Sequence, residues 1–174
     1  MKGPCLIVFA GLPGAGKTTI ARHLSKELPA TYLRIDTIED GLRASALGLG
    51  NLMGGGYAVG MELAADALSL GQSVVADAVN PSFECRKGWD AVAVYAGCGI
   101  LRVHVTCSDV NMHRARIDTR RLDGARRGAD WSEITTRAFL TPPQDWLRID
   151  TASQGVDAAA TQILDTARRL VADV

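Results

Sequence analysis

The chain has 174 residues, a length typical of one domain with a single core. Its 19 lysine and arginine residues equal its 19 aspartate and glutamate residues, so no net charge attracts it to nucleic acid or to an anionic membrane. The four cysteines form no C-x-x-C pair, which favours thiols of a reducing compartment over a zinc site or disulfides. The apolar run at residues 4–12 is too short to span a bilayer and lacks a signal-peptide pattern. These features predict a cytoplasmic protein of one domain, residues 1–174, without a membrane segment.

The first expected strand, residues 5–10, leads into the loop GLPGAGKTT at 11–19, and a helix is expected over 17–28. Gly11, four residues, then Gly16-Lys17-Thr18 is the spacing of a phosphate-binding P-loop, whose glycines let backbone N–H groups converge on one anion. We expect Lys17 to bind the β- and γ-phosphates of ATP and the Thr18 hydroxyl to hold Mg²⁺. The alternative is a glycine-rich turn that binds no ligand, but such a turn would need neither the Lys17 ammonium group nor the Thr18 hydroxyl. The residues predicted to bind the nucleotide are Gly11, Gly14, Ala15, Gly16, Lys17, Thr18 and Thr19.

The second expected strand, residues 31–35, ends in Asp36, at the same edge of the sheet as the phosphate loop. A carboxylate there could accept the proton of an attacking hydroxyl or support the Mg²⁺ shell. Alternatively, Asp36 and Glu39 fit a capping box for the helix expected over 37–47. Arg43 would lie on the same helix face as Asp36, either to bind an acceptor or as a solvated surface arginine.

Residues 48–56 contain five glycines among nine residues and precede a helix expected over 56–70. So many glycines give the backbone great freedom. The segment is either a flap over an acceptor site or a flexible connector.

The third expected strand, residues 73–76, is followed by Asp77, the position of a Walker B acid that holds Mg²⁺. No glutamate follows Asp77, which argues against a motor-type ATPase that polarises an attacking water. Asn80 and Arg86 could bind the acceptor or a phosphate at the start of a helix expected over 84–96. The pair Asn80-Pro81 is equally typical of a turn without a ligand.

The fourth expected strand, residues 100–106, leads into a helix over 109–121 in which Arg116 and Arg120 lie four residues apart on one face. Arginines on a closing segment can neutralise the charge of a moving phosphoryl group. Six arginines stand between residues 114 and 127 against two aspartates. The cluster predicts a lid at about 112–140, or else a solvated basic helix. The remaining expected elements are helices over 131–139 and 155–172 and a strand over 146–149.

Strands that alternate with helices in this way predict an α/β fold with a parallel sheet covered on both faces. In this order, the motifs resemble those of P-loop kinases in the group of zeta toxins, chloramphenicol phosphotransferase and polynucleotide kinases, the AAA_33-type ATPases. The likeness covers nearly the whole chain, and only its P-loop is highly specific. It rests on residues 11–19, 34–36 with Arg43, 74–80 with Arg86, and 116–120.

The resemblance implies a three-layer αβα P-loop NTPase with a five-stranded sheet in the order 2-3-1-4-5 and a small arginine-rich lid. It also implies ATP and Mg²⁺, a general base at Asp36, lid arginines at Arg116 and Arg120, and a segment at 149–151 beside the adenine. Polynucleotide kinases tend to have threonine where this chain has Val79, and no aromatic-lined basic groove is evident. Both points argue against a nucleic-acid acceptor.

The sequence therefore predicts an ATP-dependent phosphotransferase that moves the γ-phosphate of ATP to a hydroxyl of a small molecule. The predicted roles are catalysis by Lys17, Asp36, Arg116 and Arg120, metal binding by Thr18 and Asp77, and acceptor binding by Asp36, Arg43, Asn80 and Arg86. Two alternatives remain at this stage: a nucleotide-binding switch or ATPase without an acceptor, and a kinase of nucleic-acid 5′-hydroxyls. A monomer and a homodimer are both compatible with the sequence.

Overall fold

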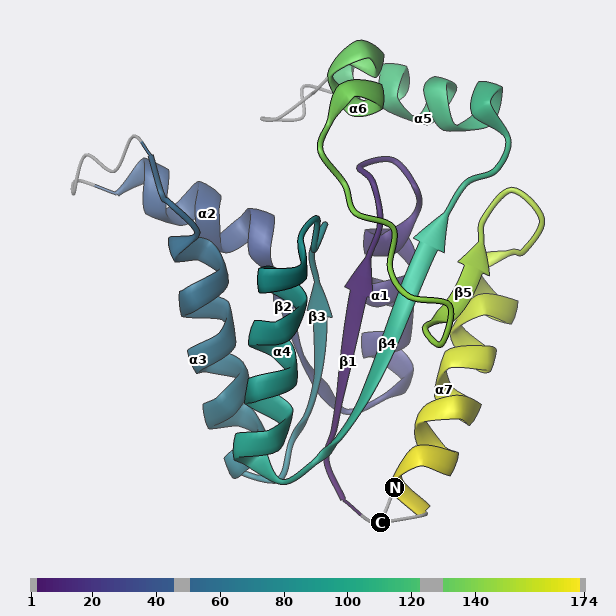
Figure 1. Cartoon of the computed structure of the whole chain (residues 1–174). Coiled ribbons are helices and arrows are strands. Elements are labelled where there is room, and N and C mark those ends of the chain that lie inside the picture. Colours follow the sequence, from purple (N-terminus) through teal and green to yellow (C-terminus); the bar gives the residue numbers. More distant parts are fainter. Residues whose placement is uncertain (1–2, 46–50, 123–129, 173–174) are drawn as a thin grey trace.

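A computed structural model describes residues 3–45, 51–122 and 130–172. For residue 121 it describes the backbone only. Five parallel strands form one sheet in the order β2-β3-β1-β4-β5 (Figure 1). This order confirms the predicted α/β fold. The strands are β1 (Cys5–Ala10), β2 (Ala30–Arg34), β3 (Ser73–Asp77), β4 (Gly99–Thr106) and β5 (Leu147–Asp150).

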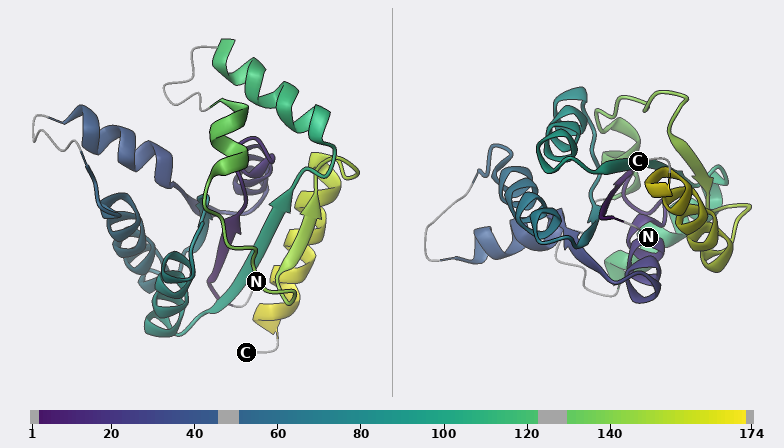
Figure 2. Two further views of the ribbon diagram at one scale, coloured as in Figure 1. Left: turned by 45° about the horizontal axis from the view of Figure 1, so that its top comes forward. Right: turned by 90° about the horizontal axis from the view of Figure 1, so that it is seen from below.

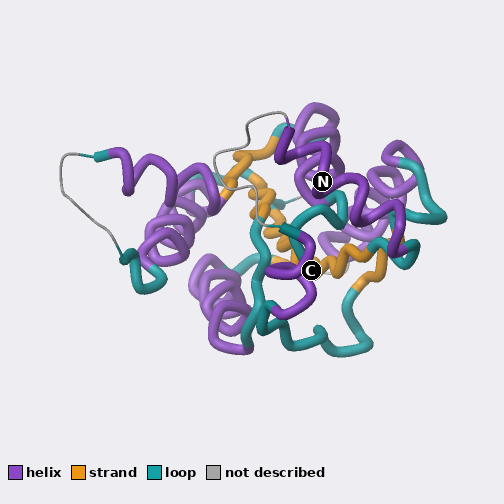
Figure 3. Tube along the Cα trace, turned by 90° about the horizontal axis from the view of Figure 1, so that it is seen from above, coloured by secondary structure: helices purple, strands orange, loops and turns teal. Residues whose placement is uncertain are grey.

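Helices cover both faces of the sheet. Seen from below, α1 (Lys17–Glu27) and α7 (Val156–Ala172) lie on one side of the strands, and α3 (Gly55–Ser69) and α4 (Phe83–Ala96) lie on the other (Figure 2, right). From above, the strands form a twisted row between the two helical layers (Figure 3). The architecture is therefore the three-layer αβα sandwich that was predicted.

The central strand shows why its sequence is uninterruptedly apolar. All six residues of β1 are buried, and they alternate between the two cores. Ile7 and Phe9 pack in the core under α1 and α7, whereas Leu6 and Val8 pack in the core under α3 and α4. A strand covered on both faces needs apolar side chains at every position, which is the pattern that predicted this strand.

Three helices stand at the carboxyl ends of the strands, where ligands of such sheets bind. Helix α2 (Ile35–Ala44) leaves the end of β2, and α5 (Val110–Leu122) and α6 (Trp131–Thr136) lie above β1 and β4 (Figure 1). Helices α5 and α6 occupy the region predicted to be a lid. In the described parts of the chain, no helix combines the length and apolar character that crossing a membrane requires.

Two of the boundaries that differ from the sequence prediction bear on the site. Strand β2 ends at Arg34 and α2 begins at Ile35 without a connecting loop, so Asp36 lies in the first turn of a helix and does not end a strand. Helix α6 ends at Thr136, three residues earlier than expected, because the chain becomes extended at its C-cap, Arg137. Residues 48–50 of the glycine-rich segment lie outside the described residues. Arg126 and Arg127 of the arginine cluster also lie outside them.

Candidate active site

The P-loop follows β1 and ends at the first turn of α1. Gly11 has a φ angle of 146°, and a Cβ atom there would lie 2.2 Å from the carbonyl oxygen of Val105, so no larger residue fits. Gly16 is the N-cap of α1 in a left-handed conformation, with φ at 104°. Both glycines shape a backbone turn at a helix N-terminus, where free N–H groups and the helix dipole favour an anion.

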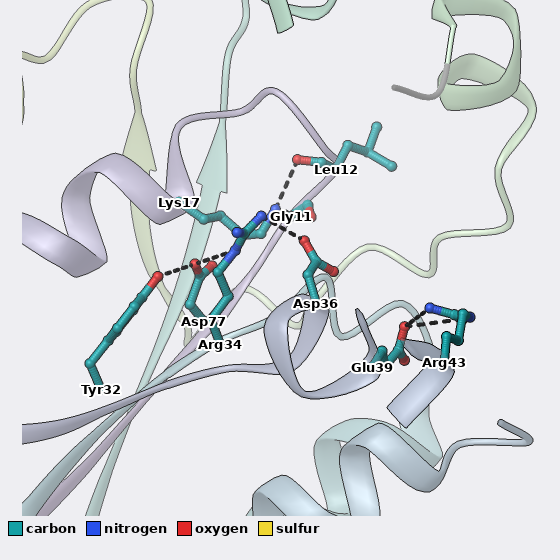
Figure 4. Close-up of polar contacts among 9 residues, drawn as sticks. All are labelled: Gly11, Leu12, Lys17, Tyr32, Arg34, Asp36, Glu39, Arg43 and Asp77. Atoms are coloured by element: carbon teal, nitrogen blue, oxygen red, sulfur yellow. Dashed lines mark hydrogen bonds and ion pairs between the residues drawn. The ribbon is translucent and has the colours of Figure 1, made fainter. Parts of the chain in front are cut away.

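Lys17 is buried beneath this loop. Its Nζ donates to the carbonyl oxygens of Gly11 and Leu12, at 2.8 and 3.0 Å (Figure 4). Burial lowers the pKa of Lys17 to about 8; the carboxylates of Asp77 and Asp36 oppose this shift, and nearby arginines add to it. An ammonium group that lacks solvation gains more than an exposed one when a phosphate approaches it.

Two carboxylates from neighbouring elements face Lys17 and share one arginine. Asp77, the last residue of β3, is 3% exposed, and its Oδ2 accepts a hydrogen bond of 2.9 Å from the Tyr32 hydroxyl. Arg34 donates through Nη2 to Oδ2 of Asp36 at 3.0 Å, and its Nε lies 3.7 Å from Oδ2 of Asp77 (Figure 4). Register explains the contact, because Arg34 pairs with Asp77 across the parallel strands.

The side chain of Asp36 is 46% exposed and lines a cavity above Lys17. The capping-box alternative is wrong, because the N-cap of α2 is Arg34 and no side chain caps this helix. Asp36 sits two positions beyond that N-cap, since β2 continues into α2 without a loop. An acid in the first helical turn is still favoured by the helix dipole.

Two cavities open on either side of the P-loop. The first, here called the acceptor cavity, has a volume of about 750 Å³, and the second, the nucleotide cavity, has about 700 Å³. Both are lined by Lys17, Thr18 and Arg120. Three residues predicted to act on the phosphates and Mg²⁺ thus stand at the border between the two cavities.

The nucleotide cavity is built from three stretches of the sequence. It takes its walls from the P-loop and α1, from α5, and from the loop that follows β5. Of the predicted nucleotide ligands, Gly11 and Ala15 are buried and do not line it. Thr151 joins the loop after β5 to the P-loop by donating to the carbonyl oxygen of Ala15, at 2.8 Å. The predicted ligands that line it are Gly14, Gly16, Lys17, Thr18 and Thr19.

The acceptor cavity draws on many separate elements and carries most of the charge. Of the residues with predicted roles, Lys17, Thr18, Asp36, Asp77 and Arg120 line it. Sequence reasoning gave its other ionisable residues no role in this cavity, because they come from several separate elements and no spacing links them. These are Arg34, Glu39, Asp40, Tyr57, Glu133 and Arg137.

Three residues predicted to bind the acceptor do not line this cavity. Arg43 pairs with Glu39 one helical turn away, at 3.5 Å. Asn80 is fully buried: its Nδ2 donates to the carbonyl oxygen of Phe9 at 2.7 Å, and its Oδ1 accepts from the Trp89 indole at 3.0 Å. Asn80 also has a φ of 48°, as expected in a tight turn. The structural alternative for Asn80 is therefore correct.

Arg86 is likewise buried, and its Nε donates to the Asn80 carbonyl oxygen at 3.0 Å. Its guanidinium group contacts the chain between α6 and β5 and not the acceptor cavity. The prediction of an acceptor ligand at Arg86 is corrected to a contact between segments.

The predicted lid arginines lie on one face of α5. Arg116 donates through Nη1 to the Thr151 hydroxyl at 2.7 Å and through Nη2 to the Thr151 carbonyl oxygen at 3.2 Å. Arg120 is exposed and borders both cavities. Both side chains line the nucleotide cavity.

The oxygen ligands at this border fit Mg²⁺. In the described residues, no group of three or more histidine, cysteine, aspartate or glutamate side chains is arranged to hold a metal ion. Mg²⁺ is typically bound by only one or two protein ligands together with water and substrate phosphates. The Thr18 hydroxyl and the Asp77 carboxylate line one cavity and meet that requirement.

Comparison with known proteins agrees with this geometry. The family model AAA_33, described as an AAA domain, matches residues 6–141, from β1 to beyond α6. The chain belongs to the AAA_33 family. No curated protein matches the sequence.

Several solved structures resemble this AAA_33 protein over nearly its whole length. They share 17–22% of its residues, so the likeness shows a common fold. The APS kinase CysC of Mycobacterium tuberculosis, in complex with AMPPNP and APS, has a TM-score of 0.73 at 22% identity and covers 94% of this chain and 96% of its own. Chaetomium thermophilum Kti12 with ADP-AlF3 has a TM-score of 0.71 at 20% identity, over 95% and 98%. A gluconokinase from Sinorhizobium meliloti has a TM-score of 0.67 at 17% identity, over 99% and 97%.

Proposed function

We propose that this protein is an ATP-dependent phosphotransferase that moves the γ-phosphoryl group of ATP to a hydroxyl group of a small molecule. The observation that carries the proposal is the meeting of two cavities at Lys17, Thr18 and Arg120, with the Asp36 carboxylate on the side away from the nucleotide. A donor in one cavity and an acceptor in the other would face each other across these residues. Phosphoryl transfer depends mainly on such positioning and on charge.

The nucleotide cavity suits ATP. Its terminal phosphates would lie on the P-loop, where Lys17 can turn from the carbonyl oxygens of the loop towards them. Thr18 and Asp77 would hold Mg²⁺, which neutralises charge on the phosphates when bound. Thr151 and the residues after it would border the adenine.

The chemical step would use residues on both sides of the border. The acceptor oxygen attacks the γ-phosphorus, a new O–P bond forms, and the bond to the β–γ bridging oxygen breaks to release ADP. Asp36 would accept the proton of the hydroxyl. Arg120, and Arg116 once it turns from Thr151, would neutralise the charge that spreads over the equatorial oxygens.

The acceptor cavity favours a small molecule over a nucleic acid. It is lined by five carboxylates, those of Asp36, Glu39, Asp40, Asp77 and Glu133, and by four cations, those of Lys17, Arg34, Arg120 and Arg137. It therefore offers no excess of positive charge to attract a polynucleotide. In this proposal the chain is one kinase-like domain, and the segment at about 112–140 is its lid.

Replacement of Asp36 by asparagine tests the proposal. Asp36→Asn should lower turnover by about 10²- to 10⁴-fold, because the general base is lost while its shape remains. ATP affinity should stay within a few-fold, since Asp36 does not line the nucleotide cavity. The acceptor for this assay is identified first: the protein is incubated with ATP and a metabolite mixture, and the phosphorylated product is detected by mass spectrometry.

Asp40→Asn is the matched control, because it removes a carboxylate from the same cavity one helical turn further along α2. Its turnover should fall by no more than a few-fold. Unchanged turnover in Asp36→Asn would remove the base from the proposal. A mixture that yields only ADP and inorganic phosphate would replace the kinase by a nucleotide-hydrolysing switch.

A further inference from the structure

The chain between α6 and β5 is held by an arginine from a different layer of the fold. Arg86 of α4 is 7% exposed, and its Nη2 donates to the carbonyl oxygen of Leu140. Its guanidinium carbon lies 5.4 Å from the centroid of the Phe139 ring and 5.6 Å from that of Trp146. A guanidinium group over two aromatic faces gains cation–π attraction in addition to its hydrogen bonds.

The same segment is bound from its other side by β5. Arg148 donates through Nη2 to the carbonyl oxygens of Pro142 and Pro143, both at 3.1 Å. Its Nη1 contacts Nδ1 of His104 at 2.9 Å, and the His104 ring stacks on Phe139 with centroids 5.9 Å apart. Burial, and then the charge of Arg148, lower the pKa of His104 to about 4, so the imidazole is neutral and can accept this hydrogen bond at physiological pH.

Side-chain donors are needed here because the segment contains two adjacent prolines, which have no backbone N–H. Its carbonyl oxygens therefore accept hydrogen bonds from arginine side chains, whereas in a sheet they would accept them from the backbone N–H groups of a neighbouring strand. One backbone bond completes the attachment, from Leu140 N to the Pro81 carbonyl oxygen at 2.9 Å. Residues 139–146, here called the return segment, are thus fixed to the chain that leaves the end of β3.

Arg137 lies two residues before the return segment and lines the acceptor cavity. It faces the same space as Lys17 and Arg120, and its charge is felt at Lys17. Arg137 is the C-cap of α6: its backbone is extended, and its N–H donates to the Ile134 carbonyl oxygen at 3.4 Å. The described anchors nearest to it in the chain are Ile134 of α6 and the return segment.

We propose that Arg137 is a further catalytic residue of this site, contacting the transferring phosphoryl group from the acceptor side, and that Arg86 is the positioning residue that holds it there. The proposal rests on the phosphotransferase function argued above. Arg137 adds a fourth cation to Lys17, Arg34 and Arg120 in the acceptor cavity, beside the place where charge moves as the bond to the bridging oxygen breaks. Arg86 acts at a distance, by fixing the return segment.

The test compares binding of Mg·ADP with binding of Mg·ADP plus aluminium fluoride, which mimics the phosphoryl group in transfer and needs no acceptor. Arg137→Gln should weaken fluoride-dependent binding by about 10- to 100-fold and leave ADP affinity within about threefold, because Arg137 does not line the nucleotide cavity. Arg86→Met should cause a loss of the same kind but smaller. The double variant should bind no more weakly than Arg137→Gln alone, because Arg86 acts through Arg137.

Two further variants keep this test independent of folding. Arg86→Lys retains the charge but loses the planar contact with two rings, and Phe139→Leu removes a ring but leaves the arginine. Each should lower fluoride-dependent binding by about threefold with ADP binding unchanged. Multiplicative losses in the double variant would show that Arg86 does not act through Arg137, and wild-type binding in Arg137→Gln would overturn the catalytic role.

The outcome is separable from that of the kinase proposal. A failure of Asp36→Asn to change turnover, with the arginine results as expected, would refute the general base and leave this inference standing. The reverse pattern, lower turnover in Asp36→Asn with wild-type fluoride-dependent binding in Arg137→Gln and Arg86→Met, would refute the roles of Arg137 and Arg86 and leave the kinase proposal standing.

Discussion

The two cavities of this protein are of nearly equal size but are built in different ways. The nucleotide cavity is lined by three stretches of sequence: the P-loop with the start of α1, one face of α5, and the loop after β5 with the start of α7. The acceptor cavity takes its lining from β2, α2, α3, β3, α5, α6 and the chain after β3 and α6, as well as from the P-loop. A general ligand such as a nucleotide can be bound by a local motif, whereas the acceptor space depends on how distant elements meet.

The strongest test of this division is Lys17, which borders both cavities. Lys17→Ala should lower turnover by about 10²-fold or more and weaken ATP binding by about tenfold or more, because both ground-state and transition-state phosphates lose a cation. Steady-state kinetics and calorimetric titration with ATP measure the two effects. Asp36→Asn is the contrasting variant, since only turnover should change. If Lys17→Ala alters turnover without altering ATP affinity, the assignment of Lys17 to both cavities is wrong.

Tyr32→Phe examines how the metal ligand is held on the acceptor side. The hydroxyl of Tyr32 donates to Asp77 at 2.9 Å, and loss of such a supporting bond typically weakens a metal site. The Mg²⁺ concentration for half-maximal activity should rise about tenfold, with metal-free ATP binding unchanged. Tyr57→Phe is a control, because the Tyr57 hydroxyl accepts a hydrogen bond of 3.0 Å from the backbone N–H of Asn80 and does not bond to Asp77. An equal Mg²⁺ requirement in Tyr32→Phe and wild type would argue against Asp77 as a metal ligand.

The smallest expected effect is a pH dependence of ATP binding. Lys17 in the free protein has a pKa of about 8, and bound phosphates favour its charged form, so binding takes up a proton above that pH. Affinity should be fully present below pH 7 and should fall by about fourfold between pH 7 and pH 8.5, as the charged fraction declines. The titration of Lys17→Ala should be flat over this range. A wild-type affinity that rises with pH would contradict the assignment.

Much of the fold followed from local patterns. The continuous apolar run of β1 predicted a buried central strand, and the alternation of strands and helices predicted a parallel sheet, since such a sheet needs helices on both faces. Asp77 was placed correctly at the end of β3. The strand boundary before Asp36 was missed, because a strand that passes directly into a helix has no turn residues to mark it.

The candidate site was predicted only in part. Arg34 lies in the motif at residues 34–36 and has no predicted role, yet its guanidinium lies between the two carboxylates. Arg137 carries no spacing signal. The sequence predicts that Arg86 could bind the acceptor or a phosphate, but its guanidinium group packs against two aromatic rings of a distant segment.

The sequence by itself determined the phosphate loop and the layered sheet, because both depend on interactions between residues that are close in the chain or repeat at regular intervals. Only the tertiary structure decided which charges share the acceptor cavity. Those positions depend on strand register, on the path of the return segment and on the packing of α5 and α6 above the sheet. The side chains of Asn80 and Arg86 show the physical reason: a buried polar group takes whichever partners the fold brings to it, and the chain order does not name them.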